Sequence, residues 1–328
     1  MRVLVTGATG FVGGNLAREL CQRGDEVCAL VRPGSSTLTI QDTQVQQIPG
    51  DILDAESVRR ALVGCQQLYH CAGSYTFWSR DVRDIYRTNV EGTRIVLQEA
   101  RQAGVNRIVY TSTVGAIGLP KQGLGTEETP VESRHLIGHY KRSKYQAEQV
   151  VLEMASQGLP VVVVNPAAPV GPWDVKPTPT GRIVLDFLNG KIPAYIETGM
   201  NVVDVSDVAA GHILAMEKGK PGQRYVLGNR NLSLQQIFGM LELLTGRRAP
   251  RWKLPFWAAL GAGYIDQIVE GKILRREPMI PLEGLKVARI PLYASSQKAI
   301  TELGLPQSPV EAALERAVKW FQDYGYRR

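Results

Sequence analysis

The chain has 328 residues, of which 44% are hydrophobic and 21% are charged, so it can bury a large core and is neither disordered nor fibrous. Its formal net charge is +7, but its basic residues are scattered and form only short pairs such as Arg247-Arg248. We expect a mild attraction for anionic ligands or membrane surfaces and no nucleic-acid partner, because nucleic-acid-binding proteins gather their cations on one surface.

The cysteines and histidines show no spacing typical of a metal site, so we predict free thiols and no bound metal. The sequence opens on an apolar segment without a charged leader, and no window approaches the roughly 18 consecutive apolar residues of a membrane span. These features predict a cytoplasmic protein with at most peripheral membrane contact. The residues concerned are Cys21, Cys28, Cys65, Cys71, His70, His135, His139 and His212.

The first element in chain order is a short apolar strand that leads into a glycine-rich turn and a helical pattern. Gly7, Gly10 and Gly13 are spaced as G-x-x-G-x-x-G, a variant of the dinucleotide-binding fingerprint. Glycine allows the tight turn and lets backbone N–H groups approach a pyrophosphate at the positive end of the helix. The cofactor contacts predicted for this turn are those of Gly7, Thr9, Gly10, Phe11 and Val12.

A second strand is predicted over residues 25–32, and it ends in Val31-Arg32, followed by Ser35 and Ser36. A carboxylate at this strand end binds the ribose 2′-hydroxyl of NAD, whereas a guanidinium beside hydroxyl groups suits a 2′-phosphate. Arg32 and Ser36 therefore favour NADP(H) over NAD(H). The alternative is that Arg32 is a solvent-exposed residue at a strand end, with no role in cofactor binding.

Two further strand ends carry residues suited to a dinucleotide. Asp51 and Ile52 follow a third strand, where a carboxylate would face the adenine amino group and an apolar side chain would lie against the ring. A fourth strand, within residues 67–73, ends in Ala72-Gly73, which leave room for the dinucleotide to cross the sheet edge. Strands and helices alternating at this spacing predict an α/β fold with a doubly wound parallel sheet, covered on both faces.

The middle of the chain combines strand-end hydroxyls with a tyrosine–lysine pair. A fifth strand runs into the hydroxyls of residues 111–113, and Tyr140 and Lys144 follow on a predicted helix, one turn apart on the same side. The Lys144 ammonium would favour phenolate and lower the pKa of Tyr140 from about 10. Taken alone, the cluster HYKRSKY is more typical of a solvated helix face, which is where we place Lys141 and Arg142. The glycine-rich turn and the strand-end hydroxyls precede this cluster in the chain, and the combination favours a catalytic role for Tyr140 and Lys144.

On these residues the sequence resembles the extended short-chain dehydrogenase/reductase family over essentially its whole length. The segments that carry the resemblance include TGATGFVG, GDILD, HCAG, TNVEGT, YTSTVGAIG, NPAAPVGP and VVDVSDVA, together with Tyr140-x-x-Ser143-Lys144 and Glu148. The chain is most similar to the dihydroflavonol reductase-like branch. The segments NPAAPVGPWDVKPTPTG and LGLPQSPVEAALERAVKWF resemble bacterial proteins labelled hopanoid-associated sugar epimerases.

The resemblance implies a Rossmann-type sheet with a smaller C-terminal lobe. Residues 1–165 would form the NAD(P)-binding domain, and a strand near 201–228 would return to it. Residues 166–200 and 229–295 would form the substrate-binding lobe, and residues 296–328 a closing helix. The resemblance also implies a homodimer, in which the helix after Asn89 and the helix of Tyr140 pack against their symmetry mates.

The resemblance also implies the roles of individual residues. Tyr140 would give a proton to a carbonyl oxygen while hydride arrives from the nicotinamide, and Lys144 would hold the ribose hydroxyls. Thr113 aligns with the catalytic serine of the family, with Ser112 as the alternative. The further cofactor contacts that the resemblance implies are Asn89, Thr111, Pro166 and Val170.

Two departures from the pattern of nucleotide-sugar enzymes bear on the substrate. Met200 stands where those members have an arginine for the substrate pyrophosphate, and Arg32 suits NADPH drawn from solution. Both favour a reductase or alcohol dehydrogenase acting on a carbonyl or alcohol of an apolar or polyol-bearing small molecule. The resemblance implies a place in hopanoid or other lipid metabolism. The alternatives are an NDP-sugar epimerase or dehydratase that retains NAD, and a non-catalytic nucleotide sensor.

Residues 245–275 combine basic side chains with Trp252, Phe256, Trp257 and Tyr264. One interpretation is a lobe helix that packs against the core. The other is an apolar mouth that admits a lipid-linked substrate or docks at a membrane surface.

Overall fold

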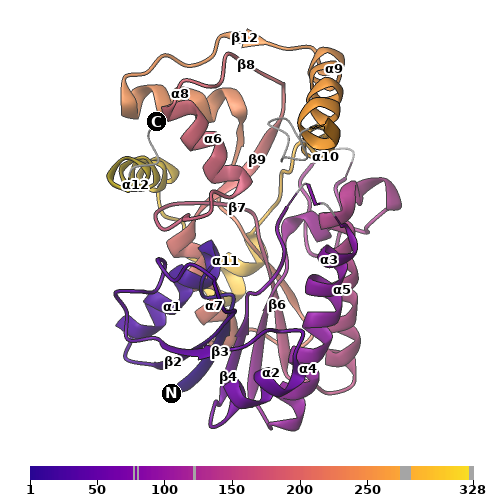
Figure 1. The fold of residues 1–328 in the computed structure, drawn as a ribbon, viewed down its shortest axis with the longest axis vertical. Helices are drawn as coiled ribbons and strands as arrows, with labels where there is room; N and C mark the ends of the chain where they lie inside the picture. Colours follow the sequence, from indigo (N-terminus) through magenta and orange to yellow (C-terminus); the bar gives the residue numbers. More distant parts are fainter. Residues whose placement is uncertain (77, 80, 121–122, 274–281, 325–328) are drawn as a thin grey trace.

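The computed structural model describes residues 1–76, 78–79, 81–120, 123–273 and 282–324 (Figure 1). The ends of two predicted segments, residues 274–275 and 325–328, lie outside these ranges.

A seven-stranded parallel sheet forms the centre of the larger part of the molecule, in the order β10-β6-β5-β4-β1-β2-β3. The predicted Rossmann-type sheet is confirmed. Its inner strands, such as β6 with all six residues buried, are largely apolar because helices cover both faces, whereas the edge strand β3 is mostly exposed. The strands are β1 (Arg2–Thr6), β2 (Glu26–Val31), β3 (Gln46–Pro49), β4 (Gln67–His70), β5 (Arg107–Thr111), β6 (Val161–Pro166) and β10 (Arg224–Leu227).

Alternate residues of each strand face opposite cores. Val3 and Val5 of β1 belong to the core that includes Leu16 of α1, whereas Leu4 belongs to the core that includes Leu62 of α2. The first core is closed by α1 (Phe11–Gln22), α7 (Val205–Lys218) and α11 (Gln297–Leu303), and the second by α2 (Ala55–Leu62), α4 (Gly92–Gln102) and α5 (Gly138–Ser156). The four cysteines are free.

A smaller lobe lies above this sheet in Figure 1 and begins where β6 passes through Ala167 into β7. Two small sheets, ordered β11-β9-β7 and β12-β8, join several helices in it. Side chains of α6, α8 and α12 fill its core. The elements are β7 (Ala168–Val170), α6 (Pro179–Leu188), β8 (Ala194–Tyr195), β9 (Gly199–Asp204), β11 (Arg230–Ser233), α8 (Leu234–Thr245), β12 (Trp252–Lys253), α9 (Phe256–Asp266), α10 (Leu282–Ala288) and α12 (Val310–Asp323).

Short helical segments complete the connections. A four-residue helix α3 (Arg83–Tyr86) runs through a π-helical stretch (Arg87–Glu91) into α4, and a second π-helical stretch (Gln267–Ile273) extends α9. Single 3₁₀ turns lie at Val114–Ala116 and Ser133–His135. Within the described ranges, no helix combines the length and hydropathy needed to cross a membrane.

Candidate active site

The glycine-rich turn after β1 packs directly on the loop after β4. Gly7 adopts φ +75°, and a Cβ built on it would lie 2.6 Å from the backbone nitrogen of Ala72. A Cβ on Gly13 would lie 2.4 Å from the Gly7 carbonyl oxygen. Gly10 is the N-cap of α1 and no side chain caps this end, so the first N–H groups of the helix can receive an anionic group. The turn therefore fits the pyrophosphate of a dinucleotide.

Arg32 and Asp51 follow neighbouring strands at the same edge of the sheet. Arg32 is exposed directly after β2, and no hydrogen bond or ion pair to another described residue holds its guanidinium. One carboxylate oxygen of Asp51 accepts the backbone N–H of Leu53 at 2.9 Å. Ile52 is buried and lies under the start of α4, where a Cβ on Gly92 would meet it at 2.7 Å. The arrangement leaves Arg32 available to a phosphate group.

Asn89 links the loop after β4 to the helix of Tyr140. Its amide nitrogen donates to the carbonyl oxygen of Ser74 at 3.1 Å and to Oγ of Ser143 at 2.9 Å, and its oxygen accepts the N–H of Ser74 at 2.7 Å. The Ser143 hydroxyl donates in turn to the carbonyl oxygen of Tyr140 at 2.8 Å. A Cβ on Gly73 would lie 3.9 Å from Nζ of Lys144, so the small residue leaves room beside the lysine.

Tyr140 and Thr113 meet at the carboxyl edge of the sheet. Tyr140 lies in the first turn of α5, and a side-chain interaction with Thr113 acts to lower the pKa of its phenol. Thr113 also accepts the N–H of Gly115 at 3.1 Å, which caps the 3₁₀ turn after β5. The hydroxyl of the neighbouring Ser112 is buried and has no hydrogen-bond partner among the described residues. Of the two candidate hydroxyls, that of Thr113 is therefore the one beside Tyr140.

Lys144 lies one turn further along α5 and is held from the sheet side. Its ammonium donates to the hydroxyl of Tyr110 at 2.9 Å and to the carbonyl oxygen of Thr111 at 2.7 Å. Burial lowers the pKa of Lys144 to about 8, against an opposing effect of the Glu148 carboxylate.

The pKa of Tyr140 differs from the expectation. Burial raises it to about 12, and the interaction with Thr113 only partly opposes this shift. The predicted lowering by Lys144 is wrong for this arrangement because the ammonium is directed at Tyr110 and Thr111, while desolvation penalises the phenolate. Tyr140 is thus a neutral phenol at pH 7, able to give a proton rather than accept one.

A network of buried polar groups holds the Thr113 loop, and sequence reasoning did not assign it. The amide of Asn165 donates to the carbonyl oxygen of Thr113 at 3.0 Å and to the carboxylate of Glu148 at 2.8 Å. Glu148 is fully buried and pairs with Arg224 at 3.2 Å. The available signal was that Asn165 and Glu148 occupy motif positions. Their pairing was not readable from sequence, because Asn165 and Glu148 are 17 residues apart and Glu148 and Arg224 are 76 residues apart.

Tyr75 is a second residue that the sequence did not single out. Its ring lies on that of Tyr140, with centroids 4.5 Å apart, and its side chain is half exposed. The available signal for Tyr75 was its position, two residues after the HCAG segment on the loop that follows β4. Tyr75 therefore lies beside Tyr140 at the edge of the candidate site.

Lys141 is not on the solvated surface, so that prediction is wrong, whereas Arg142 is exposed as expected. Lys141 is 4% exposed and lies along the 3₁₀ turn, where a Cβ on Gly115 would meet its Cγ at 3.3 Å. Burial alone lowers the pKa of its ammonium to about 8. The turn after β5 covers this side of α5, which helical periodicity could not reveal.

The residues expected to run alongside the nicotinamide, Pro166 and Val170, lie at the junction between the large sheet and the lobe. Pro166 is buried at the end of β6, and the side chain of Val170 lies in the lobe core, so only their backbone groups can meet a ligand. The Asn15 amide of α1 donates to the Pro172 carbonyl oxygen at 3.1 Å, which ties α1 to this connection.

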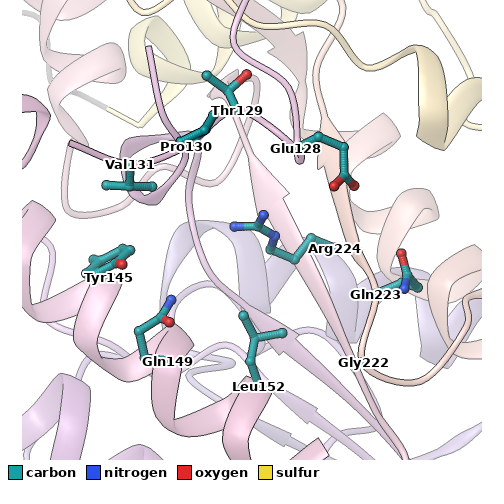
Figure 2. A pocket seen from close by; sticks show the side chains of 10 residues that line it. All are labelled: Glu128, Thr129, Pro130, Val131, Tyr145, Gln149, Leu152, Gly222, Gln223 and Arg224. Atoms are coloured by element: carbon teal, nitrogen blue, oxygen red, sulfur yellow. The ribbon is translucent and has the colours of Figure 1, made fainter. Parts of the chain in front are cut away.

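Figure 2 shows a separate pocket of about 390 Å³ between α5, the loop of residues 128–131 and the start of β10. Tyr145, Gln149 and Arg224 line it, and no predicted site residue does. The pocket lies outside the candidate active site. No group of three or more His, Cys, Asp or Glu side chains is placed to hold a metal ion in the part of the chain that the structure describes.

Known proteins share both the sequence and the fold. The model of the NAD dependent epimerase/dehydratase family matches residues 3–228. A Synechocystis sp. protein named "Putative dihydroflavonol 4-reductase" is 46% identical over 98% of this chain and 95% of its own. Sterol demethylase protein B of Methylococcus capsulatus is 37% identical over 99% of each chain. The crystal structure of gox2253 superposes with a TM-score of 0.88 at 40% identity, covering 99% of both chains.

Proposed function

Because this chain belongs to the NAD dependent epimerase/dehydratase family, whose members bind a nicotinamide cofactor, we propose that it is an NADPH-dependent reductase of an apolar carbonyl compound. The observation that carries the proposal is the neutral Tyr140 phenol, which interacts with the Thr113 side chain and lies one helical turn from Lys144 on α5. When bound, the cofactor would supply a hydride to the carbonyl carbon.

The chain itself provides the proton and the positioning. As the carbonyl oxygen gains negative charge, Tyr140 donates its hydroxyl proton to it and the carbonyl becomes an alcohol. The Thr113 hydroxyl, fixed by Gly115 and by the Asn165 bond to its carbonyl group, orients the reacting oxygen. The Lys144 ammonium, two of whose bonds go to Tyr110 and Thr111, has a third donor for a ribose hydroxyl.

Arg32 is the basis for NADPH over NADH. Its exposed, unpaired guanidinium stands where an acidic residue selects NAD, and a 2′-phosphate would be its partner. The apolar substrate class rests on Met200, a half-buried residue that packs on the lobe core where a pyrophosphate-bearing substrate would need a cation. The name of the sterol demethylase relative agrees with a lipid substrate.

An NDP-sugar epimerase or dehydratase is the second candidate, since the family name covers both activities. The two functions differ in what happens to the cofactor. A reductase consumes NADPH from solution, one molecule per alcohol formed, whereas an epimerase returns its hydride and leaves the cofactor absorbance unchanged.

The test is a substrate screen with variants of two tyrosines on one helix. Hydrophobic ketones and aldehydes and a panel of NDP-sugars are offered with NADPH or NADH. Nicotinamide absorbance is followed in every reaction, and the NDP-sugar reactions are also analysed for sugar products by chromatography. We expect oxidation of NADPH by apolar carbonyl compounds. Tyr140→Phe should lower turnover by about 10²–10⁴-fold, and Tyr145→Phe, in the separate pocket, should change it little. Normal turnover by Tyr140→Phe, or conversion of NDP-sugars alone, would refute the proposal.

A further inference from the structure

Exposed apolar side chains are concentrated in one segment of the lobe, which runs from the end of α8 through β12 into α9. Among the described residues, ten of the sixteen large apolar side chains that are exposed lie between residues 243 and 273. A single protein rarely leaves so many together unless the surface meets a partner. They are Leu243, Leu244, Trp252, Leu254, Trp257, Tyr264, Ile265, Ile268, Val269 and Ile273.

Helix α9 is oriented with its large side chains outward. Trp257, Tyr264 and Ile265 fall on one face at helical spacing and are 77%, 52% and 67% exposed. The buried positions of the same helix are the small residues Ala259 and Gly263. A helix that packs only on its own lobe would place its largest apolar side chains inward. The outward face of α9 is therefore suited to contact with an apolar partner outside the chain.

Cations precede the apolar face of α9 in the chain. Arg247, Arg248, Arg251 and Lys253 are all exposed, and Asp266 is the single acidic residue of the segment 246–269. Lys253 lies 3.8 Å from the carboxylate of Glu197, whereas no described acidic residue forms an ion pair with any of the three arginines. Trp252, 77% exposed, stands between Arg251 and Lys253. Basic residues interleaved with exposed tryptophans match an anionic lipid surface, where tryptophan occupies the headgroup boundary.

The same helix stands close to the candidate active site. Helix α9 packs against α10, and Glu283 of α10 accepts the backbone N–H of Tyr140 at 3.3 Å. Figure 1 shows α9 and α10 together above the upper ends of α3 and α5. A surface that held α9 would therefore lie one helix away from the proposed proton donor.

We propose that the α9 surface, defined as residues 247–269, docks on a bilayer that contains anionic lipids. A second copy of this chain is a poorer occupant, because a two-fold contact would bring the same four cations of each copy together. The docking itself is independent of the reaction. Only its consequence, that an apolar substrate is taken up from the lipid, rests on the proposed function.

The test is cosedimentation of the full chain with vesicles of phosphatidylcholine alone or mixed with phosphatidylserine. We expect binding to the mixed vesicles only, reversed by salt. The Arg248→Gln, Arg251→Gln double variant should bind about 30-fold more weakly, at roughly a factor of five to six for each cation. Trp252→Ser with Trp257→Ser should lower binding at least about tenfold, whereas Val63→Ser, a 68% exposed residue at the end of α2, should not change it.

Several outcomes would overturn the inference. Absence of binding to the mixed vesicles, or binding that the tryptophan variant keeps, would show that α9 is not the contact. A change in sedimentation coefficient of the lipid-free tryptophan variant would assign the surface to a protein contact instead. Melting temperatures check that the variants fold. Because vesicle binding is measured without substrate or NADPH, its failure leaves the reductase proposal standing, and failure of the reductase assay leaves the docking result standing.

Discussion

Replacement of the buried Lys141 by methionine should stabilise the protein. Methionine has a similar length and is apolar, so it can follow the same path along Gly115 without an ammonium to desolvate. Burial lowers the pKa of Lys141 from 10.5 to about 8, and at about 1.4 kcal/mol per pKa unit this corresponds to about 3 kcal/mol at pH 7. The charged side chain therefore costs the folded protein about that much.

The gain should also depend on pH in a defined direction. Since the folded pKa lies below the unfolded one, the unfolded chain binds more protons between about pH 8 and pH 10.5, and the stability of the unmodified protein rises with pH there. The advantage of Lys141→Met should thus fall from about 3 kcal/mol at pH 7 to below about 1 kcal/mol at pH 10.

Urea unfolding followed by tryptophan fluorescence at the two pH values measures both quantities. Lys319→Met, at an exposed position of α12, is the matched control and should change the unfolding free energy by less than about 0.5 kcal/mol. The reasoning is refuted if Lys141→Met is no more stable than the unmodified protein at pH 7, or if its advantage is the same at pH 10.

Three further predictions concern the cofactor turn, the cofactor and assembly. Gly7→Ala should cost about 2–5 kcal/mol of unfolding free energy and abolish NADPH binding, because it adds both αL strain and a 2.6 Å contact with the Ala72 backbone. Gly24→Ala, at φ +83° with nothing within 4 Å, should cost only about 1–2 kcal/mol and leave binding intact. Arg32→Asp should erase or reverse a preference for NADPH over NADH in titrations monitored by fluorescence, and equal affinities of the unmodified protein for both cofactors would contradict the assignment. We also propose a homodimer through α4 and α5, so sedimentation at micromolar concentration should give about twice the 36.1 kDa chain mass, and a monomer would count against it.

Local sequence determined the sheet and the composition of the candidate site. Short apolar runs located the inner strands, because a strand buried on both faces is largely apolar, as in β6. The spacing of Gly7, Gly10 and Gly13 located the tight turn after β1, where a side chain at Gly7 or Gly13 would collide with backbone atoms. Tyr140 and Lys144 could be paired because one helical turn separates them, and that separation is a property of sequence spacing.

Tertiary structure alone decided what surrounds these groups. Tyr75, whose ring covers that of Tyr140, is 65 residues away along the chain, and the Asn165 bond to the Thr113 loop spans 52 residues. The burial of Lys141 depends on where the turn after β5 lies, and the raised pKa of Tyr140 depends on desolvation by all these neighbours. The outward face of α9 was likewise undecided, since an apolar helix pattern is the same whether its large side chains meet a core or a bilayer. The periodicity of the sequence shows which residues share a helix face, and only the folded structure shows what that face contacts.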